Sequence, residues 1–337
     1  MKNKQNQLQD GWLIARNNHT YENGRRYYGY NSEHPFPDDT KGLLAHSILN
    51  IIWYHLLGEK MFVSPIGGDG QLRKNHKLLE FATRSGSWAN ALLAERWEQQ
   101  HQQQQQQQRQ RRRQEPPHPG PRLTSMDSMY MSTPTNWSYF IHHELEAEWP
   151  FTSKQAFHLI HAQSLGGILT DHDGFYARAH RHLVPGGWLE VWENDFRFFT
   201  ESNNEQDEEK LVALRQWETL MEEAADTFGK RINVAAVQKV LMLRAGFVEV
   251  DEQVFKVPLG QWSDDQRMNR AGQEYRYQMH CALEGYTLRL FTKTLGWSKE
   301  DTDVLLGRVR KELDQEEVRL YSNFHLIRGK KSTESAR

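Results

Sequence analysis

The order of strand-like and helix-like segments between residues 77 and 194 constrains the fold of this chain more than any other feature. Helical patterns over residues 88–97 and 172–183 separate short apolar runs that are typical of strands. The expected strands cover residues 77–82, 122–127, 137–145, 156–163 and 186–195. Strands that alternate with helices form a doubly wound, mostly parallel sheet. We therefore expect an α/β fold, with a turn at Pro185-Gly186-Gly187 opening the last of these strands.

The rest of the chain predicts helices at both ends and an antiparallel finish to the sheet. Apolar residues at helical spacing end before Gly58 in a first helix, and Ser298 is the expected N-cap of the last one. The first helix places Leu44, Ile48, Ile51, Ile52, His55 and Leu56 on one face. Further helices are expected over residues 211–224, up to about 244, 281–296 and 298–314, and strands over 247–260 and 321–329. A strand, helices and a last strand after a parallel set favour an antiparallel edge.

One insert differs in kind from the rest of the chain. Residues 97–121 are glutamine-rich, then arginine-rich, then proline-rich, and such a segment buries too little apolar surface to fold. We expect a disordered surface loop. The arginines from Arg109 to Arg113 read either as a nuclear-import signal or phosphate-binding patch, or simply as part of a solvated insert.

Composition narrows the class of protein. The 337 residues carry a formal net charge of −2, so nothing in the overall charge points to nucleic-acid binding. Cys281 is the only cysteine, which excludes an internal disulfide. The sequence contains neither a secretory signal nor an apolar run long enough for a bilayer. We expect an intracellular protein, cytoplasmic or nuclear, with no membrane partner.

The stretch LLEFATRSGSWANALLAE, residues 78–95, has the layout of a nucleotide-binding loop between a strand and a helix. Such loops normally hold several glycines, because the backbone must approach the ligand closely. Here Gly86 is the single glycine, and Arg84 lies in the middle of the turn. On spacing alone the stretch is a weak signal, and a plain strand-to-helix turn explains it equally well.

Motifs along the chain resemble those of the fungal LaeA-like proteins, a branch of the class I S-adenosylmethionine (SAM) methyltransferases. They occur in the order ENGRRYYGY, FPDD, MFVSPI, the segment at 78–95, SMDS, EAEWPF, FHLIHAQSLGG, VPGGWLEVWE, AGFVEV, VPLGQW, TKTLGWSKED and VRKEL. The resemblance covers nearly the whole chain except the insert. It implies a seven-stranded sheet with SAM at the carboxyl ends of the first strands. It also implies an N-terminal lid or helical segment over residues 1–60 and a methyltransferase-like domain over 61–337.

The resemblance assigns the first cofactor positions to the turn after the first strand. In the family this turn reads D-x-G-x-G-x-G, and the matching positions here are Glu80, Ala82, Arg84 and Gly86. Glu80 keeps the negative charge, whereas Ala82 adds a methyl group where the backbone approaches the ligand. Arg84 occupies a position at which a positive φ is expected, at a cost of about 1 kcal/mol or more.

Three further cofactor positions follow from the same resemblance. Asp127 matches the acid that binds the ribose hydroxyls, and its alternative role is that of a solvated turn residue. His143 and Glu144 replace a pair of acids near the adenine, so Glu144 is expected to accept from the adenine amine or to end a strand in solvent. Gln163 ends the fourth strand beside the expected methyl group, where it would contact cofactor or substrate.

Other polar groups leave alternatives open. Glu193 and Asp195 would face the substrate pocket or simply end a strand, and Tyr27, Tyr28 and Tyr30 would form a lid or anchor the N-terminal arm. Four side chains suggest a metal site, but their spacing matches no zinc pattern, so we expect no metal: His172, Asp173, His180 and His182. No catalytic base is evident in the sequence.

The resemblance therefore predicts a SAM-dependent methyltransferase in fungal secondary metabolism, either a tailoring enzyme or a regulator. The alternative is a methyltransferase-like regulatory scaffold that has lost SAM binding. A third reading is a cofactor-free enzyme that uses the same pocket. The expected partners are a small-molecule or protein methyl acceptor and regulatory proteins.

Overall fold

The computed structural model describes most of the chain, with gaps that include the insert. The described residues are 19–28, 34–73, 75–82, 84–95, 122–127, 138–142, 145–152 and 155–333. The expectations for residues 97–121, Tyr30, His143 and Glu144 lie outside these ranges. For Asp127 the structure gives the backbone only.

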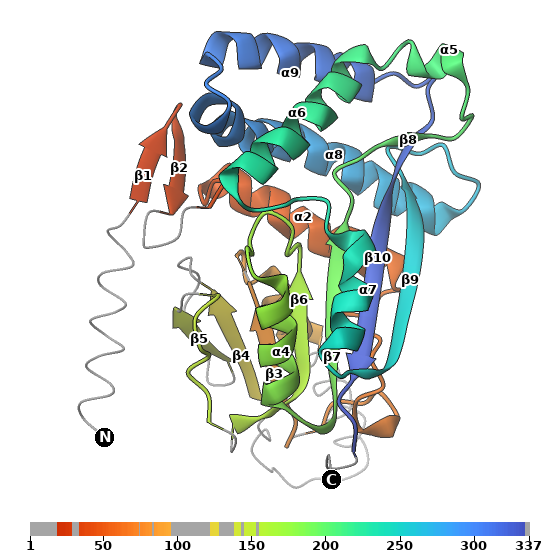
Figure 1. Ribbon diagram of the computed structural model, residues 1–337. Coiled ribbons are helices and arrows are strands. Elements are labelled where there is room, and N and C mark those ends of the chain that lie inside the picture. Colours follow the sequence, from red (N-terminus) through yellow and green to blue (C-terminus); the bar gives the residue numbers. More distant parts are fainter. Residues whose placement is uncertain are drawn as a thin grey trace, which may run out of the picture.

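A mostly parallel sheet forms the centre of the molecule (Figure 1). Its strands follow the order β5-β4-β3-β6-β7-β10, and β9 pairs with the other edge of β10. The strands are β3 (Lys77–Phe81), β4 (Arg122–Asp127), β5 (Ser138–His142), β6 (Phe157–Gln163), β7 (Leu183–Asn194), β8 (Phe199–Thr200), β9 (Val248–Pro258) and β10 (Leu320–Lys330). Strands β3 to β7 pair in parallel, whereas β10 is antiparallel to β7 and β9. The doubly wound fold with an antiparallel C-terminal edge is confirmed.

Among the residues that the structure describes, the sheet has seven longer strands and one short addition. β8 contains two residues and pairs with the first residues of β10, Leu320 and Tyr321. β8 therefore lies along the same edge of β10 as β7, whereas β9 occupies the opposite edge.

Helices cover the sheet and gather above the carboxyl ends of its parallel strands. In Figure 1, α4 and α7 lie against one face, and α2, α6, α8 and α9 lie towards the upper end. The named helices are α2 (Thr40–Leu56), α4 (His172–His182), α5 (Glu205–Glu208), α6 (Val212–Phe228), α7 (Ala235–Arg244), α8 (Gln266–Arg289) and α9 (Lys299–Leu313). A further helix spans 87–95, η1 (Ile66–Gly68) is a single 3-10 turn, and η3 (Leu290–Thr294) is a π-helical turn that continues α8. Helices α2 and α8 pack against each other.

Two expected boundaries were wrong. β7 begins at Leu183, earlier than expected, but the expected turn is present inside it as a bulge. The pairing with β6 shifts between Leu183 and Trp188, and Gly186 has a φ of 78°. The backbone of Gly186 donates to Lys331 O at 2.9 Å, and Lys331 N donates to Gly187 O at 2.8 Å, which ties this bulge to the end of β10. Helix α8 begins at Gln266, well before the expected residue 281.

The expected buried face of the first helix was only partly correct. Leu44 and Ile51 of α2 are 43% and 44% exposed, whereas His46 and Asn50 are buried. The helix therefore turns a partly polar stripe towards the protein interior.

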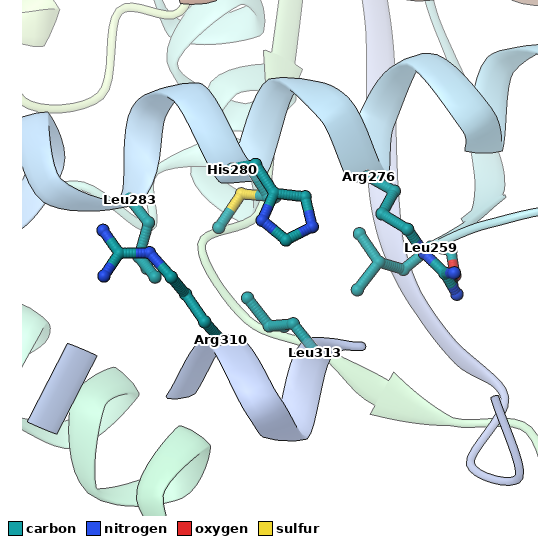
Figure 2. A pocket seen from close by; sticks show the side chains of 7 residues that line it. Leu259, Arg276, His280, Leu283, Arg310 and Leu313 are labelled. Atoms are coloured by element: carbon teal, nitrogen blue, oxygen red, sulfur yellow. Dashed lines mark hydrogen bonds between the residues drawn. The ribbon is translucent and has the colours of Figure 1, made fainter. Parts of the chain in front are cut away.

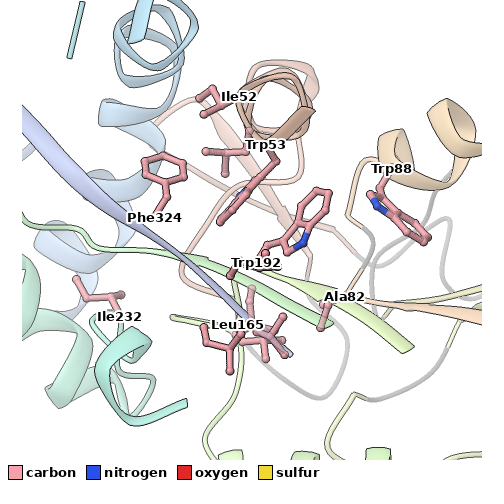
Figure 3. Packing of buried hydrophobic residues seen from close by; sticks show 14 of the residues in the cluster. Ile52, Trp53, Ala82, Trp88, Leu165, Trp192, Ile232 and Phe324 are labelled. Carbon is pink, nitrogen blue, oxygen red and sulfur yellow. The ribbon is translucent and has the colours of Figure 1, made fainter. Parts of the chain in front are cut away.

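Aromatic side chains join α2 to the sheet (Figure 3). The ring of Trp53 stacks on Trp192 of β7 with a centroid distance of 5.1 Å and meets Phe324 of β10 edge-on at 5.6 Å. Trp88, on the helix over 87–95, donates from Nε1 to Met61 O at 2.6 Å. This packing fixes α2 across the sheet, close to the carboxyl ends of the strands.

The N-terminal hairpin is anchored on α8. It consists of β1 (His19–Glu22) and β2 (Arg25–Tyr28), and Tyr27 and Tyr28 are fully buried. The guanidinium of Arg289 lies 3.8 Å from the Tyr27 ring centroid and pairs with Glu22 at 2.8 Å. These contacts favour the anchoring role for the two tyrosines.

Candidate functional site

The carboxyl ends of β3 and β6 define the candidate site. The strand order reverses between these two neighbours, and ligands of doubly wound sheets bind outside such a switch point. The sheet register places Glu80 of β3 beside His161 of β6. Gln163 is the last residue of β6, and Asp127 is the last residue of β4. The structure thus brings three of the expected cofactor residues to one edge of the sheet.

The turn after β3 keeps a left-handed backbone without the glycines. The φ angles are 56° at Ala82, 42° at Arg84 and 63° at Gly86. A left-handed conformation costs a residue with a side chain about 1–2 kcal/mol, whereas glycine adopts it freely. The expected positive φ at Arg84 is confirmed, and the same conformation holds at each of the three positions where the family has glycine.

The side chain of Arg84 points into the protein and contacts the N-terminal segment. Its guanidinium carbon lies 5.6 Å from the Phe36 ring centroid, and Nη2 donates to Pro37 O at 3.4 Å. The residue is 6% exposed, so its charge is almost entirely removed from solvent. Segment 34–39 therefore rests directly on the turn.

Phe36 connects this segment to the loops after β6 and β7. Its ring lies 6.1 Å from Phe196 and 5.2 Å from Tyr286 of α8, and the Phe196 and Tyr286 rings are 4.9 Å apart. A Cβ atom at Gly167 would lie 2.6 Å from the Phe36 ring, so only glycine fits there. Three aromatic rings thus meet above the carboxyl ends of the strands.

Helix α2 docks on the same turn through polar side chains. His46 Nδ1 lies 3.1 Å from Ser85 Oγ, and Asn50 donates to Ser87 Oγ. Burial, followed by the nearby charge of Arg84, lowers the pKa of His46 well below its ordinary value. The ring is therefore neutral, and within the described part of the chain its Nε2 has no hydrogen-bond partner.

The sequence analysis overlooked His46. The available signal was a pair of polar residues four positions apart, His46 and Asn50, inside an otherwise apolar helix. Residues at this spacing share one face of a helix. That face is the one that packs against the turn.

Gln163 and Ser164 place buried polar atoms at the carboxyl end of β6. Gln163 is 4% exposed, and neither its Nε2 nor the Oγ of Ser164 has a hydrogen-bond partner among the residues that the structure describes. Buried polar groups are normally paired, so an unpaired donor at the ligand-binding edge is a fitting contact for a bound molecule.

The two acids near the end of β7 lie on the opposite side of the sheet from α2. Glu193 accepts from Gly166 N at 3.1 Å and from Gln238 of α7 at 3.4 Å. Burial raises the pKa of Glu193 to about 7. Asp195 lies 3.6 Å from His325 Nε2. Both acids are thus held by protein groups.

The histidine-rich segment of α4 does not converge on one point. Asp173 pairs with Arg244, His180 packs edge-on against Phe247, and His182 Nδ1 bonds to Arg178 O. Within the described ranges, no group of three His, Cys, Asp or Glu side chains is arranged to hold a metal ion.

Two other structural features bear on the kind of protein. The crevice between α8 and α9 is filled by its own side chains, including His280, Leu283, Arg310 and Leu313 (Figure 2), and leaves no space for a ligand. None of the helices that the structure describes is both long and apolar enough to cross a membrane.

Known proteins resemble this chain over much of its length, although no family model matches it. The methyltransferase pytC of Aspergillus terreus is 24% identical over 312 residues, which cover 91% of this chain and 86% of that protein. The secondary metabolism regulator laeA of Aspergillus fumigatus is 26% identical over 199 residues, 59% of this chain and 52% of its own length. The protein-methionine methyltransferase laeA of Emericella nidulans is 26% identical over 201 residues. This chain thus matches about half the length of the laeA proteins.

Solved structures show a weaker likeness. Phosphoethanolamine N-methyltransferase 2 of Haemonchus contortus, in complex with SAM, has a TM-score of 0.42 at 13% identity, covering 88% of this chain and 59% of that one. The [4+2]-cyclase SpnF has a TM-score of 0.42 at 13% identity, covering 90% and 100%.

The sequence similarity to pytC extends over nearly the whole of both proteins, and several laeA proteins match the chain at a similar level. This similarity and the doubly wound sheet agree with the resemblance to LaeA-like methyltransferases that the sequence motifs indicated. The chain is similar over most of its length to a fungal methyltransferase, and over about three fifths of it to the laeA proteins.

Proposed function

We propose that this protein is a SAM-dependent methyltransferase that tailors a fungal secondary metabolite or regulates secondary metabolism. The end-to-end similarity to the methyltransferase pytC supports the enzyme, and the similarity to laeA supports the link to secondary metabolism.

The observation that carries the proposal is the backbone of the turn after β3. Ala82 and Arg84 adopt the left-handed conformation that glycine would adopt freely. A chain without a use for this shape would be more stable in a right-handed turn. The retained shape fits a cofactor whose amino-acid end lies against the backbone of the turn.

The residues at this edge suit the parts of SAM. We assign Glu80 and the backbone of Ala82 and Gly86 to the amino-acid end of the cofactor. Asp127 would accept hydrogen bonds from the ribose hydroxyls, and the unpaired Nε2 of Gln163 would donate to cofactor or acceptor. The role of Glu144 at the adenine rests on the family resemblance.

Methyl transfer from SAM depends more on the alignment of the acceptor with the methyl group than on a strong acid or base. When bound, SAM supplies a methyl group activated by its sulfonium charge. The protein must then hold the acceptor in line and exclude water. Phe36, Phe196 and Tyr286 form an apolar cover above the switch point that serves this purpose.

A second function has a specific observation in its favour. The methyl group of Ala82 and the side chain of Arg84 occupy positions that are glycine in the family, and Arg84 contacts segment 34–39. These contacts suit a methyltransferase-like scaffold that regulates through protein partners and no longer binds SAM.

The same proposal covers the methyl acceptor, the protein partners, the cellular location and the role of the N-terminal segment. The acceptor is a small molecule or a protein, and regulatory proteins are the expected partners. The protein acts in the cytoplasm or the nucleus. Segment 1–60 serves as the lid or helical elaboration of the domain over residues 61–337.

Calorimetric titration with SAM and with its demethylated product tests the proposal. We expect binding by the natural protein and a loss of about 1–3 kcal/mol in Asp127→Ala, roughly 5-fold to 150-fold in Kd. Asp303→Ala, on the exposed side of α9, is the matched control and should bind normally. If neither the natural protein nor Ala82→Gly binds SAM, the scaffold replaces the enzyme.

A further inference from the structure

A small cavity lies between the turn after β3 and the segments that cover it. Its lining residues are not the ones assigned to SAM at the carboxyl ends of β3, β4 and β6. It is enclosed by α2, α8, segment 34–39 and the turn after β3, and its volume is about 10 Å³. Aromatic and cationic groups line it together: Phe36, His46, Arg84 and Tyr286. A cavity of this size holds about one water molecule, so a larger ligand requires some of the lining side chains to move.

His46 lines this cavity and has one ring nitrogen to spare. The residue is 4% exposed, its Nδ1 is held 3.1 Å from Ser85 Oγ, and Nε2 lacks a hydrogen-bond partner among the described residues. The neutral tautomer that carries its proton on Nδ1 donates it to Ser85 Oγ, and its Nε2 then has a lone pair that can accept a proton. The cofactor roles assigned above make no use of this group.

Arg84 places a positive charge beside the same space. Its guanidinium lies 5.6 Å from the Phe36 ring centroid. Burial raises the pKa of Tyr286, and the charge of Arg84 opposes that rise. A buried cation stabilises an oxygen that becomes negative as it loses its proton. The Phe36 and Tyr286 rings, 5.2 Å apart between centroids, supply apolar walls on the other sides.

From this lining, which rests on the proposed methyltransferase function, we propose that the cavity is the acceptor site for a planar, weakly acidic hydroxyl, a phenol or enol. His46 is the catalytic base, and Arg84 binds the resulting oxyanion. The O–H bond of the acceptor breaks and its proton passes to Nε2 of His46. The oxygen then bonds to the methyl carbon while the carbon–sulfur bond of the SAM sulfonium breaks, which leaves a neutral thioether. The imidazolium returns its proton to water when the methyl ether departs.

The test compares acceptors that need a base with acceptors that do not. At about pH 8, phenol is almost entirely protonated, whereas 4-nitrophenol is largely ionised. Transfer of labelled methyl from SAM to each is measured in single-turnover reactions for the natural protein, His46→Gln and His55→Gln. His55 lies on the same helix away from the cavity and is the matched control.

We expect His46→Gln to slow transfer to phenol by about 10²–10⁴-fold and transfer to 4-nitrophenol by less than about tenfold. His55→Gln should match the natural protein with both acceptors. Arg84→Met should weaken binding of 4-nitrophenol, followed through its absorbance in the presence of the demethylated cofactor.

Three results would overturn this inference while leaving the proposed function in place. The first is equal slowing of both phenols by His46→Gln, which would make the residue structural. The second is methylation of benzoate or of a methionine peptide but of neither phenol. The third is SAM binding with no transfer to, and no binding of, either phenol. If the natural protein does not bind SAM, the proposed function itself fails.

Discussion

His161 makes the stability of this protein depend on pH in a way that a single substitution can isolate. The imidazole is 1% exposed and stacks on Trp88 at a centroid distance of 4.2 Å, with Trp192 edge-on at 4.4 Å. In the part of the chain that the structure describes, neither ring nitrogen has a hydrogen-bond partner. Burial lowers the pKa of His161 to about 3 from 6.5.

The direction and size of the effect follow from linkage. The unfolded chain binds a proton at His161 below pH 6.5, whereas the folded protein does not until the pH falls to about 3. Folding stability is therefore complete above pH 6.5 and decreases as the pH falls between these two values. Between pH 7.5 and pH 5.0 this one group removes about 2 kcal/mol, since each pH unit below 6.5 costs about 1.4 kcal/mol.

The assay is urea unfolding at pH 7.5 and pH 5.0 for the natural protein and His161→Phe. Other buried histidines, His34 and His46, add to the pH dependence of both proteins equally. The variant should lose about 2 kcal/mol less than the natural protein over this interval. The comparison uses only the change in unfolding free energy of each protein between the two pH values, so the variant's stability at either pH does not affect it. An identical pH dependence of the two proteins would refute the reasoning, because His161 would then bind its proton equally in both states.

Three other predictions concern the turn, the cover and the insert. Gly167→Ala should lower the free energy of unfolding in urea by about 1–3 kcal/mol, because φ is 75° and the new Cβ would meet Phe36. Gly296→Ala has a φ of 73° and open space around it, so it should cost clearly less. Equal costs in the two variants would exclude the clash with Phe36. Ala82→Gly should tighten SAM binding up to about tenfold by calorimetry, because the left-handed turn becomes unstrained; unchanged or weaker binding would contradict this. Deletion of residues 97–121 should leave the thermal midpoint nearly unchanged, and a large drop would show that the insert packs on the domain.

The sheet was predictable because its signals are local. Each parallel strand is a short apolar run between turn residues, and Ser298 caps α9 as expected, accepting from Asp301 N. Helix α8 was only half recognised because its first turns bury small and polar residues, among them Ala271, Gly272 and Gln278. Such residues pack well only against specific partners, and local periodicity does not reveal them. Gly272, for example, packs against Pro258 and Gly260 at the end of β9.

The candidate site was predictable at the sheet edge and not above it. Glu80, Asp127 and Gln163 end strands, so their shared position follows from the parallel order of the sheet. The arrangement above it depends on contacts between distant segments, such as Arg84 with Pro37 and His46 with Ser85. No local pattern encodes these pairs, because each requires the hairpin, α2 and α8 to be in place first.

The position of β10 has a consequence for how the protein is made. This strand follows every other strand in the chain, yet it lies between β7 and β9 in the sheet. Until residue 330 has left the ribosome, the edges of β7 and β9 have no β10 to pair with. Because exposed strand edges recruit other chains, the unfinished protein passes through an aggregation-prone stage during translation. Its yield in a cell should therefore depend on chaperones more than its final stability suggests.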